Sequence, residues 1–545
     1  MPLVKNQIIP LTIDALSSDG NGVGRFEGQA VFVPFAAVGD VLSVKVVKIC
    51  KSYAFGIVES VLTPGTGRIP ADCPIFGRCG GCCFRHLSYE AELAAKQGFV
   101  ADALRRIGGL DVPVRDILPS PQTERYRNKV QYPLFLAGDG SVQAGFYASR
   151  SHRPLSCGDC LLQPGLLNRI AATLCALLTQ YHISVYDEQA HRGLARHIYL
   201  RHAVTNGSVL VCLVCNGRSL PHAQDICAAL VKAHPEVESV VLNVNTHKTN
   251  VITGKECITL YGPGVLRDTM RGVPVALGPL SFYQVNTEGA NRLYSVAADF
   301  AAPGPEDTLL DLYCGAGTIG LSMAEHCGRL IGVEIVPEAV ESARRNAAAM
   351  GVEHAEFFCA DAGTAAQKLA ADGLLPNIVV LDPPRKGCDE PTLKAVLAMA
   401  PQRIVMVSCN PATAARDLKY LSQHGYAVQA VQPVDMFPRT KHVETVVQLV
   451  RKKPDTYIDI TVDMNELDLT SSEAKATYDE IKDYIFDKHC VKVSSLYIAQ
   501  IKQKHGIIER DCYNNSKKDN QKQPQCPPEK VKLIEEALRH FKMIS

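Results

Sequence analysis

The stretch TLLDLYCGAGTIGL, residues 308–321, contains the pattern that decides the fold. An apolar run ends at Tyr313, and Gly315, Gly317 and Gly320 follow with the spacing G-x-G-x-x-G. Glycines at this spacing let the backbone turn tightly after a strand and approach a ligand at the N-terminus of the next helix. The stretch therefore predicts a strand, a ligand-binding turn and a helix within an α/β sheet.

The flanking sequence, residues 273–453, repeats this alternation of strand and helix. A helix is predicted at 337–351, and strands are predicted at 308–313, 329–335, 356–361, 377–384, 403–410 and 445–452. This rhythm predicts an open, largely parallel, doubly wound sheet.

Carboxylates stand at the ends of three consecutive predicted strands. Glu334, Asp361 and Asp382 are expected along the carboxyl edge of the sheet, where such folds bind their ligands. So many acids would repel the pyrophosphate of a dinucleotide, whereas S-adenosylmethionine has a sulfonium cation and no phosphate. The pattern therefore favours a methyltransferase over a dinucleotide-binding enzyme.

Two further motifs indicate the kind of methyl transfer. LDPPRKG places Arg385 where enzymes that methylate amino groups have an aromatic residue, and VMVSCNP places Cys409 at a strand end. A thiolate that adds to C6 of uracil makes C5 nucleophilic enough to take a methyl group. A general base must then remove the C5 proton, and Glu444 stands where the last predicted strand begins.

Five motifs together resemble the RNA uracil-C5 methyltransferase family. They are FYQVN (282–286), LDLYCGAGTIGL (310–321), LDPPRKG (381–387), SCNPAT (408–413) and DMFPRTKHVET (435–445). With the N-terminal barrel and the cysteine stretch described below included, the resemblance is to its 23S ribosomal RNA branch. The resemblance covers about residues 7–453.

This resemblance implies roles for seven residues. Cys409 would be the nucleophile and Glu444 the base. Asp361 would face the adenine, and the other contacts to S-adenosylmethionine would come from Gln284, Tyr313, Glu334 and Asp382. Thr318 departs from relatives that carry Asn there, so no contact is assigned to it. The alternatives are a transfer-RNA uracil-C5 methyltransferase and a non-catalytic iron–sulfur RNA-binding protein.

Residues 7–60 alternate apolar and polar positions in short runs, which predicts four or five strands closing into a small β-barrel. The glycine-rich segment 17–25 is interpreted as a hairpin turn. The segment DGNGVGRFEGQAVFVPFAAVGD (19–40) resembles a TRAM domain, an OB-like barrel, and this resemblance implies RNA binding.

Four cysteines occur in CPIFGRCGGCC, residues 73–83. A reducing compartment disfavours a disulfide, and the C-x5-C spacing of Cys73 and Cys79 does not suit a zinc ribbon. Three thiolates, from Cys73, Cys79 and Cys82, with a distant fourth, suit a [4Fe–4S] cluster. Spacing leaves Cys157 and Cys160 open as the fourth ligand. The family pattern selects Cys160, so that Cys83 would be a bystander and the cluster a structural or RNA-facing element.

Residues 112–270 are strand-rich. The segments 125–133 and 192–201 mix cations with aromatic residues, as RNA-binding surfaces do. Cys212 and Cys215 form a CxxC within a predicted strand, so we expect them in the buried core on opposite faces.

Residues 455–545 are predicted to form a small helical appendage. A helix at 470–489 begins with a capping box, Thr470 to Glu473, and a second at 494–506 ends at Gly506, as in a helix–turn–helix. Two roles stay open: packing on the catalytic body, or a basic arm on RNA.

The predicted architecture has four parts. Residues 1–62 form the TRAM barrel, 63–272 the cysteine stretch and a mixed α+β RNA-binding domain, 273–453 a Rossmann-like S-adenosylmethionine methyltransferase domain, and 454–545 the helical tail. Basic and acidic residues balance, 57 against 56, so global charge points to no partner. The sequence has no run of about 18 apolar residues and no signal-peptide pattern at its start. We expect a cytoplasmic monomer that binds RNA and neither DNA nor a membrane.

Overall fold

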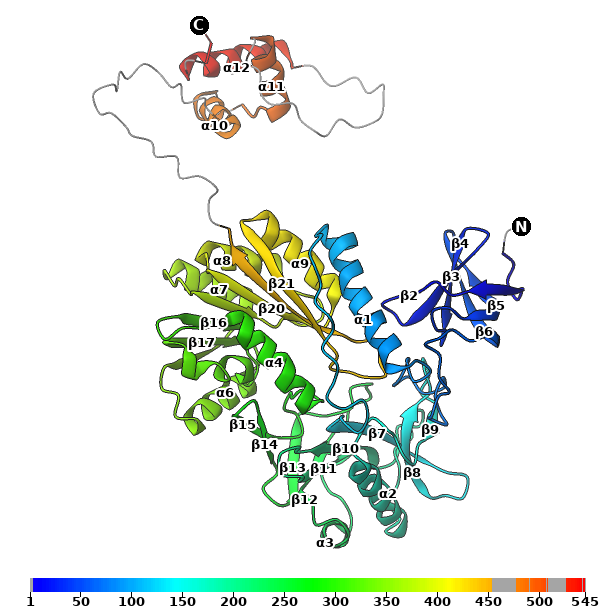
Figure 1. Ribbon diagram of the computed structural model, residues 1–545. Helices are drawn as coiled ribbons and strands as arrows, with labels where there is room; N and C mark the ends of the chain where they lie inside the picture. Colours follow the sequence, from blue (N-terminus) through cyan, green and yellow to red (C-terminus); the bar gives the residue numbers. More distant parts are fainter. Residues whose placement is uncertain are drawn as a thin grey trace. The chain divides into compact units, whose positions relative to one another are not determined.

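The computed structural model describes residues 3–452, 477–489, 491–505, 507, 526–541 and 543–544. The chain divides into two compact units, Met1–Lys453 and Pro454–Ser545. Figure 1 shows three sheets along the first unit, the N-terminal one in blue, the central one in cyan and green, and the last in green and yellow.

The N-terminal sheet has six strands in the order β1-β5-β6-β4-β3-β2. They are β1 (Ile8–Thr12), β2 (Ala15–Leu16), β3 (Asn21–Phe26), β4 (Gln29–Pro34), β5 (Val41–Ile49) and β6 (Tyr53–Thr63). Alternate residues of the strands are buried in a common core that includes Val31, Val33 and Val44. This sheet confirms the predicted small β-fold.

The glycine-rich segment 17–25 is not only a turn. The turn occupies its first residues, and Asn21 already begins strand β3, which pairs with β4. Gly22 and Gly24 face the core, and a Cβ at Gly24 would lie 2.2 Å from the carbonyl oxygen of Thr12. The hairpin interpretation is confirmed, because β3 pairs antiparallel with β2 and Gly22 stands opposite Leu16. Gly22 and Gly24 also allow a close approach between strands.

The central sheet has seven strands in the order β13-β12-β11-β10-β7-β8-β9. Its elements are β7 (Lys129–Leu136), β8 (Val142–Tyr147), β9 (Pro154–Ser156), α2 (Gly165–Gln180), β10 (Ala195–His202), β11 (Val209–Cys215), α3 (Ala223–Ala233), β12 (Val237–Val244) and β13 (Glu256–Tyr261). Cys212 and Cys215 are fully buried and belong to two different hydrophobic clusters. This confirms that they are core residues on opposite faces of β11.

The third sheet follows the order β18-β17-β16-β19-β20-β22-β21. Its strands are β16 (Thr308–Leu312), β17 (Arg329–Glu334), β18 (Ala355–Cys359), β19 (Ile378–Leu381), β20 (Arg403–Ser408), β21 (Tyr426–Val434) and β22 (Glu444–Arg451). The five strands β16 to β20 are parallel to one another, whereas β22 runs antiparallel to both β20 and β21. The predicted doubly wound sheet is confirmed, although β21 was missed.

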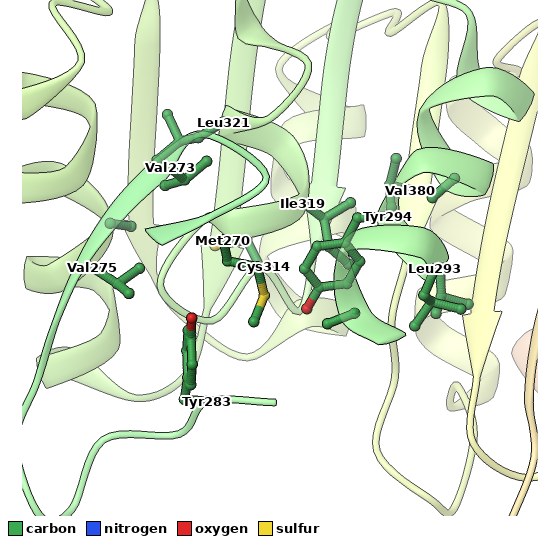
Figure 2. Packing of buried hydrophobic residues seen from close by; sticks show 14 of the residues in the cluster. Met270, Val273, Val275, Tyr283, Leu293, Tyr294, Cys314, Ile319, Leu321 and Val380 are labelled. Atoms are coloured by element: carbon green, nitrogen blue, oxygen red, sulfur yellow. The ribbon is translucent and has the colours of Figure 1, made fainter. Parts of the chain in front are cut away.

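Helices cover both faces of this sheet. They are α4 (Thr287–Ala301), α5 (Thr318–Leu321), α6 (Pro337–Ala349), α7 (Ala362–Ala371), α8 (Glu390–Met399) and α9 (Pro411–Gln423). Figure 2 shows one core, where Leu293 and Tyr294 of α4 pack beside Ile319 of α5. The hairpin of β14 (Leu266–Met270) and β15 (Val273–Leu277) contributes to the same core and spans residue 272, where we had predicted a domain boundary.

Helix α1 (Tyr89–Ala103) packs with the third sheet, although it follows the cysteine stretch in sequence. Its N-cap is Ser88, whose hydroxyl accepts a hydrogen bond from the Ala91 N–H. Val100 and Ala103 pack in the cluster formed by α8, α9 and the sheet, and α1 lies beside α9 in Figure 1. This placement brings the cysteine stretch next to the third sheet and its helices.

The second unit contains the helices α10 (Tyr478–His489), α11 (Ser495–Lys504) and α12 (Pro528–His540). Ile481, Ile498 and Ile534, one from each helix, meet in its core. The two predicted helices correspond to α10 and α11, whereas α12 was not predicted. Thr470, Glu473 and Gly506, which we assigned to helix ends, lie outside the described residues. Among the helices of the described part of the chain, none has the length and apolar character needed to cross a membrane.

Candidate active site

The glycine turn joins β16 to α5. Gly315 and Gly317 have φ angles of 56° and 77°, in the left-handed region that favours glycine. Gly320 lets α5 approach the sheet closely, because a Cβ there would lie 2.8 Å from Leu330 and 2.9 Å from Asp311. Tyr313 also has a positive φ, 67°, which is uncommon for a residue with a side chain and is often found at functional sites.

Glu334 is held against this turn at the end of β17. Its carboxylate accepts hydrogen bonds from the backbone N–H of Gly315, at 3.0 Å, and of Val336, at 2.9 Å. Asp311 lies beneath the turn and accepts a hydrogen bond from the Gly320 N–H. Burial raises the pKa of Asp311 to about 8. The turn is therefore lined by carboxyl groups, as predicted for a cation-binding pocket.

Two other predicted cofactor contacts occupy a separate corner. Asp361 is exposed and caps α7 by accepting a hydrogen bond from the Thr364 N–H at 3.1 Å. The hydroxyl of Tyr313 lies 3.4 Å from Thr392 Oγ1 on α8. Gly363 lies in this corner, since a Cβ there would lie 3.1 Å from Thr392 Oγ1 and 3.4 Å from Asp361 Oδ1.

Cys409 and Glu444 meet at the carboxyl edge of the sheet. β20 and β22 pair antiparallel with Ser408 opposite Thr445, so the next residues in register are Cys409 and Glu444. The negative charge of Glu444 raises the pKa of the Cys409 thiol, together with the larger effect of burial. The structure thus brings the predicted nucleophile and base together.

Burial and neighbouring charges tune Glu444. It is 5% exposed, and burial with the negative charge of Asp382 raises its pKa to about 8. Burial also raises the pKa of Asp382 to about 7. Carboxyl groups with pKa values near neutrality are suited to proton transfer.

Arg385 is the cation of this cluster. Its positive charge lowers the pKa of both Cys409 and Glu444 against the opposing effect of burial, and its side chain forms a hydrogen bond with the Cys409 thiol. Its carbonyl oxygen accepts hydrogen bonds from Asn410 Nδ2 at 3.1 Å and Thr413 Oγ1 at 3.3 Å. The 382–388 loop is therefore tied to the start of α9, directly after Cys409.

Tyr294 connects the two halves of the site. It is 3% exposed, and its hydroxyl bonds the side chains of Gln284 and Thr318, while the charges of Asp382 and Glu444 act on it. The backbone of Gln284 is fixed, because its main-chain carbonyl oxygen accepts a hydrogen bond from Asn128 Nδ2 at 2.9 Å. The sequence analysis missed Tyr294, since its spacing in α4 is that of a core residue.

His442 and Arg439 flank Glu444 in different ways. Burial and the nearby cation Arg385 lower the pKa of His442 to about 4, so the imidazole is neutral. Arg439 acts mainly through its backbone, whose carbonyl oxygen accepts hydrogen bonds from the N–H groups of Cys83 and Phe84. Arg439 therefore anchors the loop that leads to Glu444.

The predicted cluster ligands also approach one another. The negative charge of Cys160 raises the pKa values of both Cys79 and Cys82, beyond the larger effect of burial. Cys73 contributes in the same way to Cys79, and Cys157 lies within hydrogen-bonding distance of Cys160. Cys83 has Lys96 and Glu92 as its nearest charged groups.

Within the described ranges, no three or more His, Cys, Asp or Glu side chains form a group that could hold a metal ion. A single ion needs its ligands to converge on one point, whereas a cubane takes each thiolate at a different iron. Among the described residues, the cysteine side chains therefore do not converge on one point as the ligands of a single ion would.

The doubly wound sheet, its glycine turn and the acidic groups at the strand ends define an S-adenosylmethionine-dependent methyltransferase. Sequence comparison gives the narrower class. A profile of the family described as tRNA (uracil-5-)-methyltransferase matches residues 88–452, and a TRAM domain profile matches residues 2–58. The chain belongs to the tRNA (uracil-5-)-methyltransferase family, and it is an RNA uracil-C5 methyltransferase with an N-terminal TRAM domain.

Relatives match the first unit over nearly their full length. An uncharacterized RNA methyltransferase of Halalkalibacterium halodurans is 42% identical over 452 residues, 83% of this chain and 98% of the relative. One from Clostridium tetani is 39% identical over 447 residues, 82% of this chain and 97% of the relative. The tRNA (uracil-54, C5)-methyltransferase of Pyrococcus abyssi, solved with S-adenosyl-L-homocysteine, is 28% identical with a TM-score of 0.65, over 81% of this chain and 99% of that chain.

Proposed function

We propose that this protein methylates C5 of a uridine in 23S ribosomal RNA through a covalent adduct between Cys409 and C6 of the base. The meeting of Cys409 and Glu444 at one sheet edge, beside the glycine turn, carries the proposal. A binding protein without catalysis has no need for a thiol and a carboxyl group of raised pKa at neighbouring positions of that edge.

S-adenosylmethionine supplies an electrophilic methyl group when it is bound. The donor set fits this cation, because carboxyl groups line the turn and the Oδ1 atom of buried Asp311 has no hydrogen-bond partner. Gln284, Glu334 and Asp382 would hold it around the turn, and Tyr313 and Asp361 would contact it from the corner at Gly363.

The residues of the chain then act in sequence. The Cys409 thiolate adds to C6, and the electron pair of the C5–C6 double bond shifts to C5, which takes the methyl group. Glu444 accepts the C5 proton, the double bond re-forms, and the Cys409 thiolate leaves with its electron pair. Arg385 supports the first step because its positive charge favours the thiolate.

The adduct tests this mechanism directly. RNA containing 5-fluorouridine should form a stable covalent complex with the protein in the presence of S-adenosylmethionine, visible as a shifted band after denaturing electrophoresis. Cys409→Ser should form none. A shifted band in that variant would assign the nucleophile elsewhere, and its absence in the unaltered protein would contradict the mechanism.

The choice of ribosomal RNA rests on the resemblance of the motifs, the barrel and the cysteines to the 23S branch. Transfer RNA is the second candidate, since the Pyrococcus abyssi tRNA enzyme matches 81% of this chain. Mapping 5-methyluridine in 23S and transfer RNA from cells with and without the protein decides between them. Loss of the mark from transfer RNA alone would overturn the ribosomal assignment.

The four predicted thiolates support a [4Fe–4S] cluster as a resident group. Cys73, Cys79, Cys82 and Cys160 would hold it, and it would supply a rigid structural link near the loop of residues 435–441. Methyl transfer from a sulfonium needs no electron from it.

Iron and sulfide content test this cluster. Protein purified without oxygen should contain about four irons per chain. Cys160→Ser should lose most of this iron, whereas Cys83→Ser should keep it. If Cys157→Ser loses iron and Cys160→Ser does not, Cys157 is the fourth ligand. Zinc in place of iron would reject the cluster.

A further inference from the structure

The segment of residues 435–441, which we name the junction loop, connects β21 to the strand that begins at Glu444. Its backbone is tied from several sides. The carbonyl oxygen of Met436 accepts a hydrogen bond from Asn286 Nδ2 at 3.0 Å, and that of Pro438 accepts one from the Tyr126 hydroxyl at 2.9 Å. The carbonyl of Arg439 receives the N–H groups of the cysteine stretch, as described above.

The centre of these contacts is a fully buried ion group on α1. Lys96 Nζ lies 2.7 Å from Glu92 Oε1 and 2.7 Å from Asp435 Oδ1, and all three side chains have no exposed surface. The same ammonium donates to the carbonyl oxygen of Phe437 at 3.1 Å. Glu92 Oε1 accepts the backbone N–H of Arg439 at 2.7 Å. Lys96 and Glu92 therefore hold the junction loop at Asp435, Phe437 and Arg439.

The pairing of these buried charges fixes particular groups of the junction loop. Removing ions from water is costly, so fully buried charges occur where they are paired and hydrogen-bonded. Two carboxylates share the single ammonium, and the guanidinium of Arg439 lies 3.8 Å from Glu92. Asp435 is fixed further by the Tyr89 hydroxyl at 2.8 Å. Apolar residues would pack α1 on the sheet equally well, but they would not fix the carbonyl of Phe437 or the N–H of Arg439.

We propose that Lys96 is a positioning residue for the base of the reaction: shared between Glu92 and Asp435, it fixes the junction loop so that Glu444 reaches the C5 proton. The carbonyl of Arg439 is the last of these fixed backbone groups. Only four residues, Thr440 to Val443, lie between Arg439 and Glu444. Catalytic groups displaced by about 1 Å lose on the order of 10²-fold in rate, so a loosened loop affects proton removal first. This inference rests on the proposed function.

Two RNA substrates separate positioning from general damage. 5-Fluorouridine has no C5 proton, so its adduct forms without the base, whereas ordinary uridine needs Glu444 to release the product. In Lys96→Met and Asp435→Asn, turnover of ordinary RNA should fall on the order of 10²-fold, the contribution typical of a general base. A covalent adduct with ordinary RNA should accumulate, as in Glu444→Gln, while the rate of adduct formation with 5-fluorouridine RNA should stay unchanged.

Further variants control for folding. Lys96→Arg keeps the cation and should restore most of the turnover. Val100→Ala, one turn further along α1 and buried in a different cluster, should lower thermal stability without accumulating adduct. Tyr126→Phe removes only the hydrogen bond to Pro438 and should accumulate a smaller amount of adduct. This variant keeps the test available if Lys96→Met does not fold.

The outcomes discriminate between this inference and the proposed function. Equal losses with both RNAs in Lys96→Met, or no adduct with ordinary RNA, would overturn the positioning role and leave the proposed mechanism in place. If Glu444→Gln itself turns over ordinary RNA at the normal rate, both the base assignment and the positioning role fail.

Discussion

At the scale of single residues, the proposed role of Glu444 as the base predicts how the reaction depends on pH. A carboxyl group accepts a proton only when it is ionised, and the pKa of Glu444 is raised to about 8. Below that pH most molecules carry a protonated Glu444, so product release should accelerate as the pH rises through about 8 and level off above it. Single-turnover methylation between pH 6 and 9.5 measures this.

Arg385→Gln extends the same prediction. Since Arg385 lowers the pKa of both Glu444 and Cys409, its loss should move the rise in product formation to higher pH. Adduct formation with 5-fluorouridine RNA should shift in the same direction. Lys386→Gln, which removes the exposed neighbouring cation, should leave both profiles unchanged. Coincident profiles for Arg385→Gln and the unaltered protein would remove Arg385 from the site.

The sequence predicts that Cys409 and Glu444 lie close together, because both stand at strand ends. Each stands where an apolar run begins or ends, and such ends converge at one edge of a doubly wound sheet. Tyr294 and Lys96 were not predictable in this way. Both lie within helices, where spacing alone does not distinguish a core or solvent-facing side chain from one that meets a residue 88 positions away, as Tyr294 meets Asp382, or 339 positions away, as Lys96 meets Asp435. Their partners come from tertiary packing.

At the scale of elements, strand β3 shows what glycine allows. A Cβ at Gly24 would lie 2.2 Å from the Thr12 carbonyl, a contact that the fixed backbone cannot relieve. Gly24→Ala should destabilise the N-terminal sheet by about 1–3 kcal/mol, as overpacking does. Gly98, in the middle of α1, has open space around its Cβ position, so Gly98→Ala should stabilise the helix by about 1 kcal/mol.

Thermal unfolding of the two variants measures these opposite signs. A neutral Gly24→Ala would mean that β3 moves away from β1 without cost. The hairpin of β2 and β3 was predictable from the sequence, whereas the close contact of Gly24 with Thr12 depends on how β1 packs against β3. Helix α1 and the parallel strands were predictable because their periodicity is local. β21 was missed because its apolar and polar residues follow no regular period.

At the scale of the whole molecule, the two compact units correspond to the extent of the family match. The profile match ends at residue 452, and the second unit begins at Pro454 with a hydrophobic core of its own. A chain ending at Lys453 should therefore fold and methylate RNA at a rate within about twofold of the full chain. Methylation of extracted ribosomal RNA by both chains measures this, and loss of activity would assign the second unit a part in the reaction.

The TRAM domain presents an aromatic group on the outer face of its sheet. The rings of Phe32, Tyr53 and Phe55 contact one another with centroids 5.6–5.8 Å apart, and Tyr53 is 38% exposed. Lys48 and Arg25 stand on the neighbouring strands, Lys48 opposite Phe55 and Arg25 opposite Ala30. Aromatic rings beside cations bind unpaired bases of RNA, each stack contributing about 1–3 kcal/mol.

Leucine substitutions at Tyr53 and Phe55 keep apolar volume and remove the stacking face. The double variant should bind the RNA substrate about tenfold more weakly. The turnover rate at saturating RNA should stay unchanged, because these rings contact one another and not Cys409 or Glu444. Ile57→Ala removes an equally exposed apolar side chain from the same strand, 43% exposed, and should not alter the affinity. Filter binding with the full substrate, repeated at two salt concentrations, separates stacking from phosphate contacts, since only the latter weaken with salt. Unchanged affinity in the double variant would show that RNA follows another face of the domain.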